Sequence, residues 1–338
     1  MNPNWRSFLD SNKAAFKNES DEVLDFGDVA GELKAAQNDS VVVPLTHLGL
    51  IEATGDDAKS FLHSQFTSDI NHLGNEQVQH SAWCTAKGRM QASFLVWRVG
   101  DIFRLIVSGD LEAVSLKRLQ MFVLRSKVKL SSMTESQLLL GLSGPQATAA
   151  LAEAGLPCPV APMTAATTPA ASVLMLQENR FIVSADQAMV GEIWSKFVLK
   201  ARPAGIPAWR WLDVQSGFPL VTAATKEEFV PQMADFEKLG GISFHKGCYP
   251  GQEIVARTQY LGKVKRHLYR IRSDQALLAG ADLHSPDNPD QASGKVVSGA
   301  PSPNGGYEAL AVVQSNFAGN LHLGSREGPK IEAVAVNP

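Results

Sequence analysis

The sequence predicts an α+β protein, with two tandem βαββαβ-like units that form antiparallel sheets and a small C-terminal β-barrel. Strand-like and helix-like spacings alternate in the same order twice between residues 41 and 261. Beyond this region only short strand-like runs remain, and Gly, Pro, Asn and Asp separate them. The repeated order indicates the two units, and the short runs indicate the barrel.

The chain of 338 residues is too long for one ordinary core, so several domains are expected. Residues 1–40 are polar and weakly periodic, and we expect an N-terminal extension there with one helix near residues 19–26. We then expect a first α+β domain over 41–132 and a second over 133–261, with a signature loop (residues 240–258) at its end. The barrel domain is expected over 262–338.

The first α+β domain is predicted to run strand, helix, two strands, strand, helix, strand. The two strands form a hairpin around residues 85–89, where Gly88 supplies a positive φ. The expected elements lie at 50–53, 55–66, 78–84, 91–98, 103–107, 110–122 and 127–130.

The second domain is predicted to repeat this order around a connector rich in Pro, Ala and Thr at 155–171. Trp209 and Trp211 fall on its last strand, where they would point to the same side. Core packing and an aromatic wall for a heteroaromatic ligand are both consistent with this pair. The expected elements lie at 138–142, 143–154, 173–176, 180–183, 185–200 and 209–214, and the barrel strands at 267–272, 295–297, 309–313 and 331–336.

Composition argues against several classes of protein. Hydrophobic residues make up 44% and charged residues 19%, which is typical of a globular protein. The net charge of -3 argues against a general nucleic-acid binder, since backbone binding needs a basic surface. A basic run of Lys263, Lys265, Arg266, Arg270 and Arg272 is usually a solvated strand face, but it also suits an anionic tail or RNA.

The cysteine and histidine patterns argue against disulfide and metal sites. Cys84, Cys158 and Cys248 are odd in number, and no CxxC, HxH or HExxH spacing occurs. We therefore expect no metal site and a reducing, cytoplasmic setting. No apolar stretch of about 18 residues and no apolar N-terminal segment occur, so we expect neither a membrane span nor a secretory signal.

The most informative motif is residues 240–253, which place Cys248 just after His245 and Lys246. A helix start follows at Gly251, and basic neighbours and a helix N-terminus both favour the thiolate form of a cysteine. Glu253 and Arg257, spaced i, i+4, would stabilise this short helix. A buried structural cysteine is the competing interpretation, and the residues alone leave both open.

The chain resembles the YgfZ family of folate-binding proteins, relatives of the aminomethyltransferase (T-protein) of the glycine cleavage system. Lys246 to Glu253 fit the family's K-G-C-Y-x-G-Q-E signature. The resemblance covers about residues 42–335. Further segments that look family-like are 54–58, 65–69, 84–88, 229–232 and 239–244.

The resemblance implies a three-domain protein with a folate site in a central channel. It also implies a role in assembling or repairing iron–sulfur enzymes, including those that methylthiolate tRNA. Cys248 would be the reactive thiol, with Lys246 beside it, and Trp209 and Gln215 would bind tetrahydrofolate or a derivative. The remaining signature-loop residues are Gly247, Tyr249, Gly251, Gln252 and Glu253.

Two positions depart from the family pattern. Leu48 stands where a second family tryptophan would align, so one aromatic wall of the folate site is missing. Gln215 replaces the pterin-holding Glu of the T-protein relatives. An amide offers one donor and one acceptor, whereas a carboxylate accepts two N–H bonds. We therefore expect weakened or altered folate binding.

Three functions are consistent with these features. The leading one is a folate-binding accessory protein, a monomer without a reaction of its own, whose partners are iron–sulfur enzymes such as tRNA methylthiolases. The alternative is a folate-dependent one-carbon or aminomethyl transferase, which needs a general base that residues 101–107 do not supply. The third is a direct, weak contact with tRNA through the basic run at 263–272.

Overall fold

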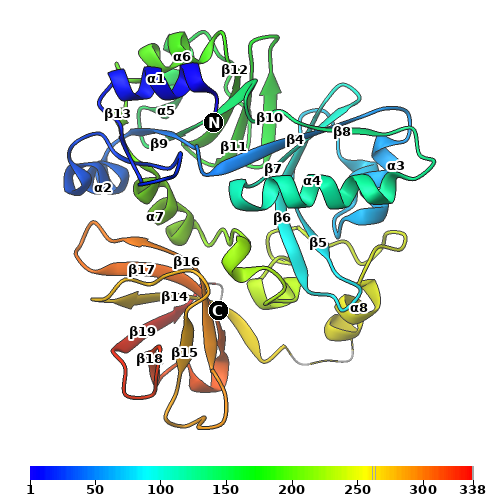
Figure 1. Ribbon diagram of the computed structural model, residues 1–338, viewed down its shortest axis with the longest axis vertical. Helices are drawn as coiled ribbons and strands as arrows, with labels where there is room; N and C mark the ends of the chain where they lie inside the picture. Colours follow the sequence, from blue (N-terminus) through cyan, green and yellow to red (C-terminus); the bar gives the residue numbers. More distant parts are fainter. Residues whose placement is uncertain (261, 263, 337–338) are drawn as a thin grey trace. The chain divides into compact units, whose positions relative to one another are not determined.

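A computed structural model describes residues 1–260, 262 and 264–336 of the chain. Its open sheets, its closed barrel and its helices confirm the predicted α+β class (Figure 1). No helix among these described residues combines the length and the apolar character that crossing a bilayer requires.

The chain divides into two compact units, each assembled from separate segments. The predicted domain boundaries after residues 40, 132 and 261 divide the chain into consecutive segments, so they do not coincide with the boundaries of these units. The first unit consists of residues 1–61, 72–79 and 95–209, and the second of residues 62–71, 80–94 and 210–338.

The first unit contains a six-stranded sheet with the order β10-β11-β12-β9-β3-β13. Its strand pairs are antiparallel except β13, which runs parallel to β3. The strands predicted at 138–142, 173–176 and 180–183 are confirmed, and β10 is an additional strand within the predicted connector. The strands are β3 (Val41–Pro44), β9 (Gln137–Ser143), β10 (Thr164–Thr167), β11 (Ala171–Gln177), β12 (Arg180–Asp186) and β13 (Arg202–Pro203).

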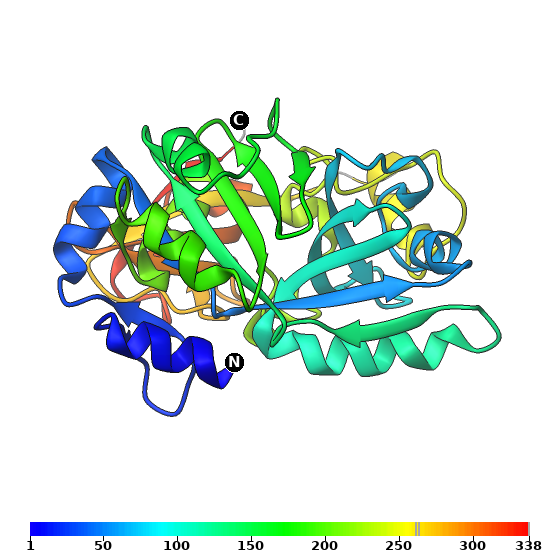
Figure 2. The ribbon, with the colours of Figure 1, turned by 90° about the horizontal axis from the view of Figure 1, so that it is seen from above.

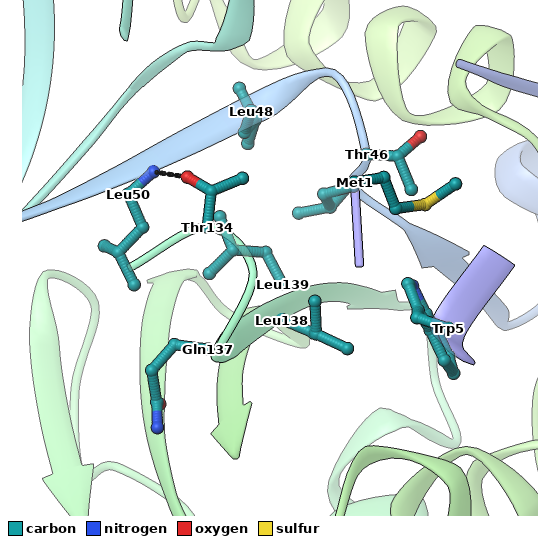
Figure 3. A pocket seen from close by; sticks show the side chains of 10 residues that line it. Met1, Trp5, Thr46, Leu48, Leu50, Thr134, Gln137, Leu138 and Leu139 are labelled. Carbon is teal, nitrogen blue, oxygen red and sulfur yellow. Dashed lines mark hydrogen bonds between the residues drawn. The ribbon is translucent and has the colours of Figure 1, made fainter. Parts of the chain in front are cut away.

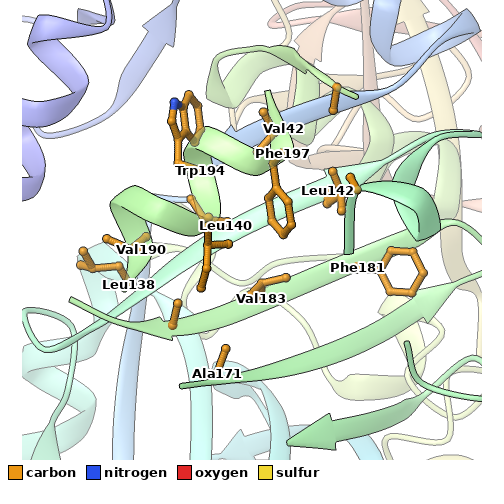
Figure 4. Close-up of a cluster of buried hydrophobic side chains, with 14 of the residues drawn as sticks. Val42, Leu138, Leu140, Leu142, Ala171, Phe181, Val183, Val190, Trp194 and Phe197 are labelled. Carbon is orange, nitrogen blue, oxygen red and sulfur yellow. The ribbon is translucent and has the colours of Figure 1, made fainter. Parts of the chain in front are cut away.

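Two helices contribute to the core of this sheet, α5 (Ala147–Glu153) and α6 (Val190–Phe197). The buried side chains of α6 follow the i, i+3, i+4, i+7 spacing of an amphipathic helix, so one face of α6 is apolar. Figure 4 shows Trp194 and Phe197 of α6 among the aliphatic side chains of β9 and β12. The helix predicted at 185–200 is confirmed in its central part.

A five-stranded sheet has the order β5-β6-β7-β4-β8. Its elements follow the predicted order of strand, helix, two strands, strand, helix, strand. The turn at residues 85–89 is present, with Gly88 at a φ of 71°. The elements are β4 (Leu48–Thr54), α3 (Ala58–Gln65), β5 (Val78–Cys84), β6 (Met90–Val99), β7 (Ile102–Ser108), α4 (Gly109–Val123) and β8 (Lys129–Ser132).

The N-terminal 40 residues belong to the first unit's core and do not form a polar arm. They form α1 (Pro3–Ser11), β1 (Ala15–Phe16), β2 (Val23–Asp25) and α2 (Val29–Asn38), so the helix expected near 19–26 is wrong. Trp5 of α1 is 3% exposed and meets Trp194 edge-on at 6.0 Å between ring centroids. A few buried side chains attach this segment to the core of the first unit. A segment that is polar on average can still have one apolar helix face.

The strand predicted at Trp209–Val214 is wrong, because this segment lies in helix α7 (Ile206–Ser216). Residues two apart on a helix are rotated by about 200° about the axis, so Trp209 and Trp211 do not share a face. Pro207 in the first turn was the available sequence signal, since proline is favoured there. The spacing of the two tryptophans, two residues apart, matched the period of a strand and misled the prediction.

The C-terminal barrel is confirmed as a closed sheet with the order β14-β17-β16-β15-β18-β19. All four predicted strands fall within it, and the short β15 and β18 are additional. The strands are β14 (Arg266–Ser273), β15 (Asp282–His284), β16 (Gly294–Pro301), β17 (Tyr307–Gln314), β18 (Leu321–Leu323) and β19 (Lys330–Ala335). The remaining helices are α8 (Gln252–Tyr260) and the 3-10 turns η1 (Ile70–His72), η2 (Ala223–Thr225), η3 (Pro231–Ala234) and η4 (Ser315–Phe317).

Candidate functional site

The signature loop of the second unit carries an exposed thiol between two anchored residues. Cys248 is exposed, whereas Lys246 is partly buried and Tyr249 is only 6% exposed. Helix α8 begins at Gln252, one residue after the predicted start at Gly251 and four residues after the cysteine. The competing interpretation of Cys248 as a buried structural cysteine is therefore wrong.

Lys246 anchors the loop to the end of α3. Its ammonium donates hydrogen bonds to three backbone carbonyl oxygens, those of His63, Phe66 (2.5 Å) and Ser68 (2.9 Å). The last carbonyls of a helix have no partner within the helix, and they carry partial negative charge. A lysine has three N–H donors, so these bonds use all of them.

Burial lowers the pKa of Lys246 to about 8, and the nearby negative charge of Asp69 acts in the opposite direction. At neutral pH the side chain is therefore still mainly the ammonium that its three acceptors require. With every N–H directed at a carbonyl, Lys246 acts as a positioning residue for the loop that carries Cys248.

Tyr249 fixes the other side of the cysteine. The ammonium of Lys246 lies 5.1 Å from the centroid of its ring, within the range of a cation–π contact. Burial raises the pKa of Tyr249, so the phenol stays neutral. The exposed Cys248 is thus flanked on both sides by side chains that hold the backbone in place.

Gly251 allows the hairpin turn at 85–89 to pack against the start of α8. Its φ is 82°, and a Cβ at this position would lie 2.4 Å from the carbonyl oxygen of Thr85. Gly88 also approaches the helix closely, since its Cβ would lie 3.0 Å from the side chain of Ile254. Both glycines are needed for this close approach.

The other signature residues are placed at the surface. Gly247 is exposed, Gln252 is partly buried and Glu253 is exposed in the first turn of α8, where a carboxylate suits the helix dipole. The expected pair of Glu253 and Arg257 is not formed as an ion pair in the part of the chain that the structure describes. The helix forms without it.

The segment that accepts the hydrogen bonds of Lys246, residues 63–68, had no role in the sequence prediction of the site. Thr67 is fully buried; its hydroxyl donates to the carbonyl of Gly241 at 2.6 Å and accepts from the N–H of Ala82 at 2.9 Å. The backbone N–H of Ser243 donates in turn to the carbonyl of Thr67. The polar residues of segment 65–69 were a signal for it, because serine and threonine side chains often bond to nearby backbone groups.

Gln215, expected to hold a folate, is already bonded at both ends of its amide. Its Nε2 donates to Glu308 and its Oε1 accepts from Arg270. Glu308 also accepts from the hydroxyl of Ser302 at 2.6 Å. Each of these two atoms therefore already makes one hydrogen bond, while one N–H of Nε2 and one lone pair of Oε1 lie outside these bonds.

Trp209, the other expected folate residue, is 2% exposed. Within the first unit its ring lies so close to Gly141 that a Cβ there would come within 2.5 Å of it. The guanidinium carbon of Arg180 lies 4.4 Å from its ring centroid. The ring thus packs as a core residue of the first unit.

Leu48, where the family's second tryptophan would align, lines a small cavity of the first unit (Figure 3). The cavity has a volume of about 50 Å³, well below the roughly 300–1,000 Å³ typical of ligand pockets. Trp5 contributes the aromatic ring on its wall. This cavity is too small for a pterin.

The three cysteines differ sharply in their surroundings. Cys84 is 1% exposed, and burial raises its pKa to about 12, whereas Cys158 and Cys248 are exposed. Of the residues that the structure describes, no group of three or more His, Cys, Asp or Glu side chains is arranged to hold a metal ion. Cys84 is therefore a core residue.

Thiol labelling should separate these cysteines. With an aromatic disulfide reagent at pH 8, we expect two thiols to react quickly and Cys84 only after unfolding, because a pKa of about 12 leaves about one thiolate in 10⁴. A Cys158→Ser variant should keep a single fast thiol, which is Cys248. Rapid labelling of three thiols in the folded protein would contradict this assignment.

The chain is similar to known proteins over most of its length. A family model described as the GCVT N-terminal domain matches residues 12–161. The tRNA-modifying protein YgfZ of Escherichia coli O157:H7 is 33% identical over 253 residues, which is 72% of this chain and 77% of that protein. YgfZ of Shigella dysenteriae serotype 1 is 32% identical over the same shares.

The fold also matches that of a solved structure. The glycine cleavage system aminomethyltransferase T from Bartonella henselae superposes with a TM-score of 0.79, covering 97% of this chain and 95% of that one. The two sequences are 18% identical, so this likeness concerns the fold. It confirms the aminomethyltransferase-like architecture that the sequence predicted.

Proposed function

Since the chain belongs to the family of the tRNA-modifying protein YgfZ, we propose that it acts in tRNA modification as an accessory protein whose working group is the Cys248 thiol. The partners would be iron–sulfur enzymes such as tRNA methylthiolases, served by a cytoplasmic monomer. The family resemblance supports these partners, and the geometry of the signature loop supports the role of the thiol.

The observation that carries the proposal is an exposed cysteine on a loop whose neighbours are held rigidly. A structural cysteine is ordinarily buried, as Cys84 is. An accessible thiol is required for contact with another protein or with a cluster that it carries. The three bonds of Lys246 and the burial of Tyr249 fix the position of that thiol without covering it.

Complementation tests the function. In a bacterial strain that lacks its own YgfZ gene, expression of this chain should restore methylthiolation of tRNA, measured by mass spectrometry of digested nucleosides. The empty vector serves as the control. Failure to restore the modification, with the protein present at a normal level, would count against a role in tRNA modification.

Folate binding is the second part of the proposal, and the family resemblance supports it. Since Trp209 is buried and the amide of Gln215 is occupied at both ends, we assign neither residue to the ligand. Binding at Gln215 would use the N–H and the lone pair that lie outside these two bonds, or would exchange one of the bonds for the pterin.

A titration with tetrahydrofolate tests this part. We expect a saturable quench of the intrinsic tryptophan fluorescence, and the Trp209→Phe variant isolates the contribution of that ring among the 6 tryptophans of the chain. A quench that Trp209→Phe leaves intact would place the ligand away from this ring. The absence of any saturable quench would remove folate from the proposal.

A further inference from the structure

A groove of about 770 Å³ in the second unit gathers cationic side chains from three separate parts of the chain. Lys87 and Arg89 come from the turn between β5 and β6, and Arg257 comes from α8. Lys265 and Arg266 come from the start of the barrel. Among the described residues that line the groove there is no carboxylate, and Gln291 and Gln314 add polar groups.

Within residues 1–260, 262 and 264–336, no ion pair joins any of these five cations to a carboxylate. By contrast, Lys295 of the same unit pairs with Glu228 at 3.5 Å and with Asp282 at 3.1 Å. The positive charge in the groove is therefore uncompensated, although the whole chain carries a net charge of -3.

Two of the guanidinium groups are held in place by the backbone. Arg89 donates to the carbonyl oxygen of Glu228, and Arg266 donates to that of Ala292 at 3.4 Å. Lys87, Arg257 and Lys265 are exposed. Guanidinium and ammonium groups arranged in this way bind phosphate oxygens, and arginine does so with two parallel bonds.

We infer that this groove binds the sugar–phosphate backbone of RNA. The inference rests on the proposed role in tRNA modification and gives the chain its own contact with the RNA. A concave protein surface can enclose an RNA strand, whereas a flat lipid surface contacts protein surfaces that protrude. Tyr260, 65% exposed and three residues beyond Arg257 on α8, offers a ring on which an unpaired base can stack.

The groove adjoins the signature loop through shared elements. Arg257 lies on the helix that begins four residues after Cys248, and the turn with Lys87 and Arg89 packs on the first residues of that helix through Gly88 and Gly251. An RNA strand in the groove would therefore lie close to the loop that presents the thiol.

The basic run predicted at 263–272 contributes only in part. Lys265 and Arg266 line the groove, but Arg270 bonds to Gln215, and Lys263 lies outside the described residues. The run alone does not define the surface, because three of the five cations come from the turn and from α8.

Fluorescence anisotropy with a labelled, unmodified tRNA transcript tests the groove. With five phosphate contacts, the logarithm of the association constant should fall with the logarithm of the salt concentration with a slope of about -4. A Lys87→Ala/Arg257→Ala/Lys265→Ala variant should bind on the order of 100-fold more weakly at about 0.1 M salt, with a slope shallower by roughly 2–3.

The matched control is Lys117→Ala/Arg125→Ala/Lys200→Ala, which makes the same charge change at exposed positions of the first unit and should bind like the wild type. Urea unfolding of all three proteins checks that they fold. Equal weakening in both variants, or no salt-dependent binding by the wild type, would overturn the inference. So would a preference for vesicles of equal parts phosphatidylcholine and phosphatidylglycerol over tRNA.

Complementation separates this result from the proposed function. If the wild type restores tRNA methylthiolation but shows no groove-dependent RNA binding, the groove assignment fails and the proposed function stands. If tRNA binding follows the predicted pattern and methylthiolation is not restored, the groove stands as an RNA site and the proposed function fails.

Discussion

Replacement of Cys248 by alanine is expected to reduce tRNA methylthiolation, in a strain without its own YgfZ gene, to the level of the empty vector. The thiol is exposed and has no packing role, so the loss would be chemical and not structural. An exposed side chain of this size should change the free energy of unfolding by no more than about 0.5 kcal/mol. Nucleoside mass spectrometry and urea unfolding measure the two quantities separately.

Cys158→Ala is the matched control, because Cys158 is also a free, exposed cysteine but lies far from the signature in sequence. It should restore methylthiolation like the wild type. If Cys248→Ala also restores it fully, including under oxidative stress, the thiol has no part in the function. If neither variant restores methylthiolation, the loss follows from removing any exposed thiol, and the function cannot be assigned to Cys248.

Replacement of Lys246 by methionine is expected to destabilise the second unit by roughly 2–4 kcal/mol. Methionine has a similar length and no donor, so the carbonyls of His63, Phe66 and Ser68 lose the bonds of the ammonium. Urea unfolding measures the loss. Lys330→Met, at an exposed lysine of the same unit, should stay within about 0.5 kcal/mol of the wild type.

The pH dependence gives a second test of this contact. The pKa of Lys246 is about 8 in the folded protein, below its ordinary value of 10.5, so between these values the unfolded chain binds more protons. The stability of the wild type should therefore rise relative to Lys246→Met as the pH increases from about 8 to about 10.5. A constant difference between the two proteins would contradict the burial of the ammonium.

Local patterns predicted much of the fold and the center of the site. The alternation of helical and strand-like spacing gave the order of elements in the five-stranded sheet, and short alternating runs gave the barrel. Cys248, its basic neighbours and the helix start after it stand within a few residues of one another, so their relation is visible in the sequence. Whether Cys248 is exposed or buried could not be read from that motif; the structure shows it exposed.

Two local patterns gave wrong predictions, because the burial of particular side chains determined the local structure. The alternating Trp209 and Trp211 suggested a strand, but packing on Gly141 and a proline in the first turn go with helix α7. The N-terminal segment is polar on average, yet Trp5 is buried in the core of the first unit. Average polarity does not reveal which single face of a helix finds an apolar partner.

The sequence by itself determined the α+β class and the barrel, and it indicated Cys248 as the candidate thiol, since each depends on residues that are close along the chain. Only the tertiary structure decided what these residues touch. It directs Lys246 to carbonyls 178 or more residues away, satisfies Gln215 from the barrel, and joins Lys87 and Arg257 in one groove. Such contacts depend on chain segments that meet only on folding, and no local spacing encodes them.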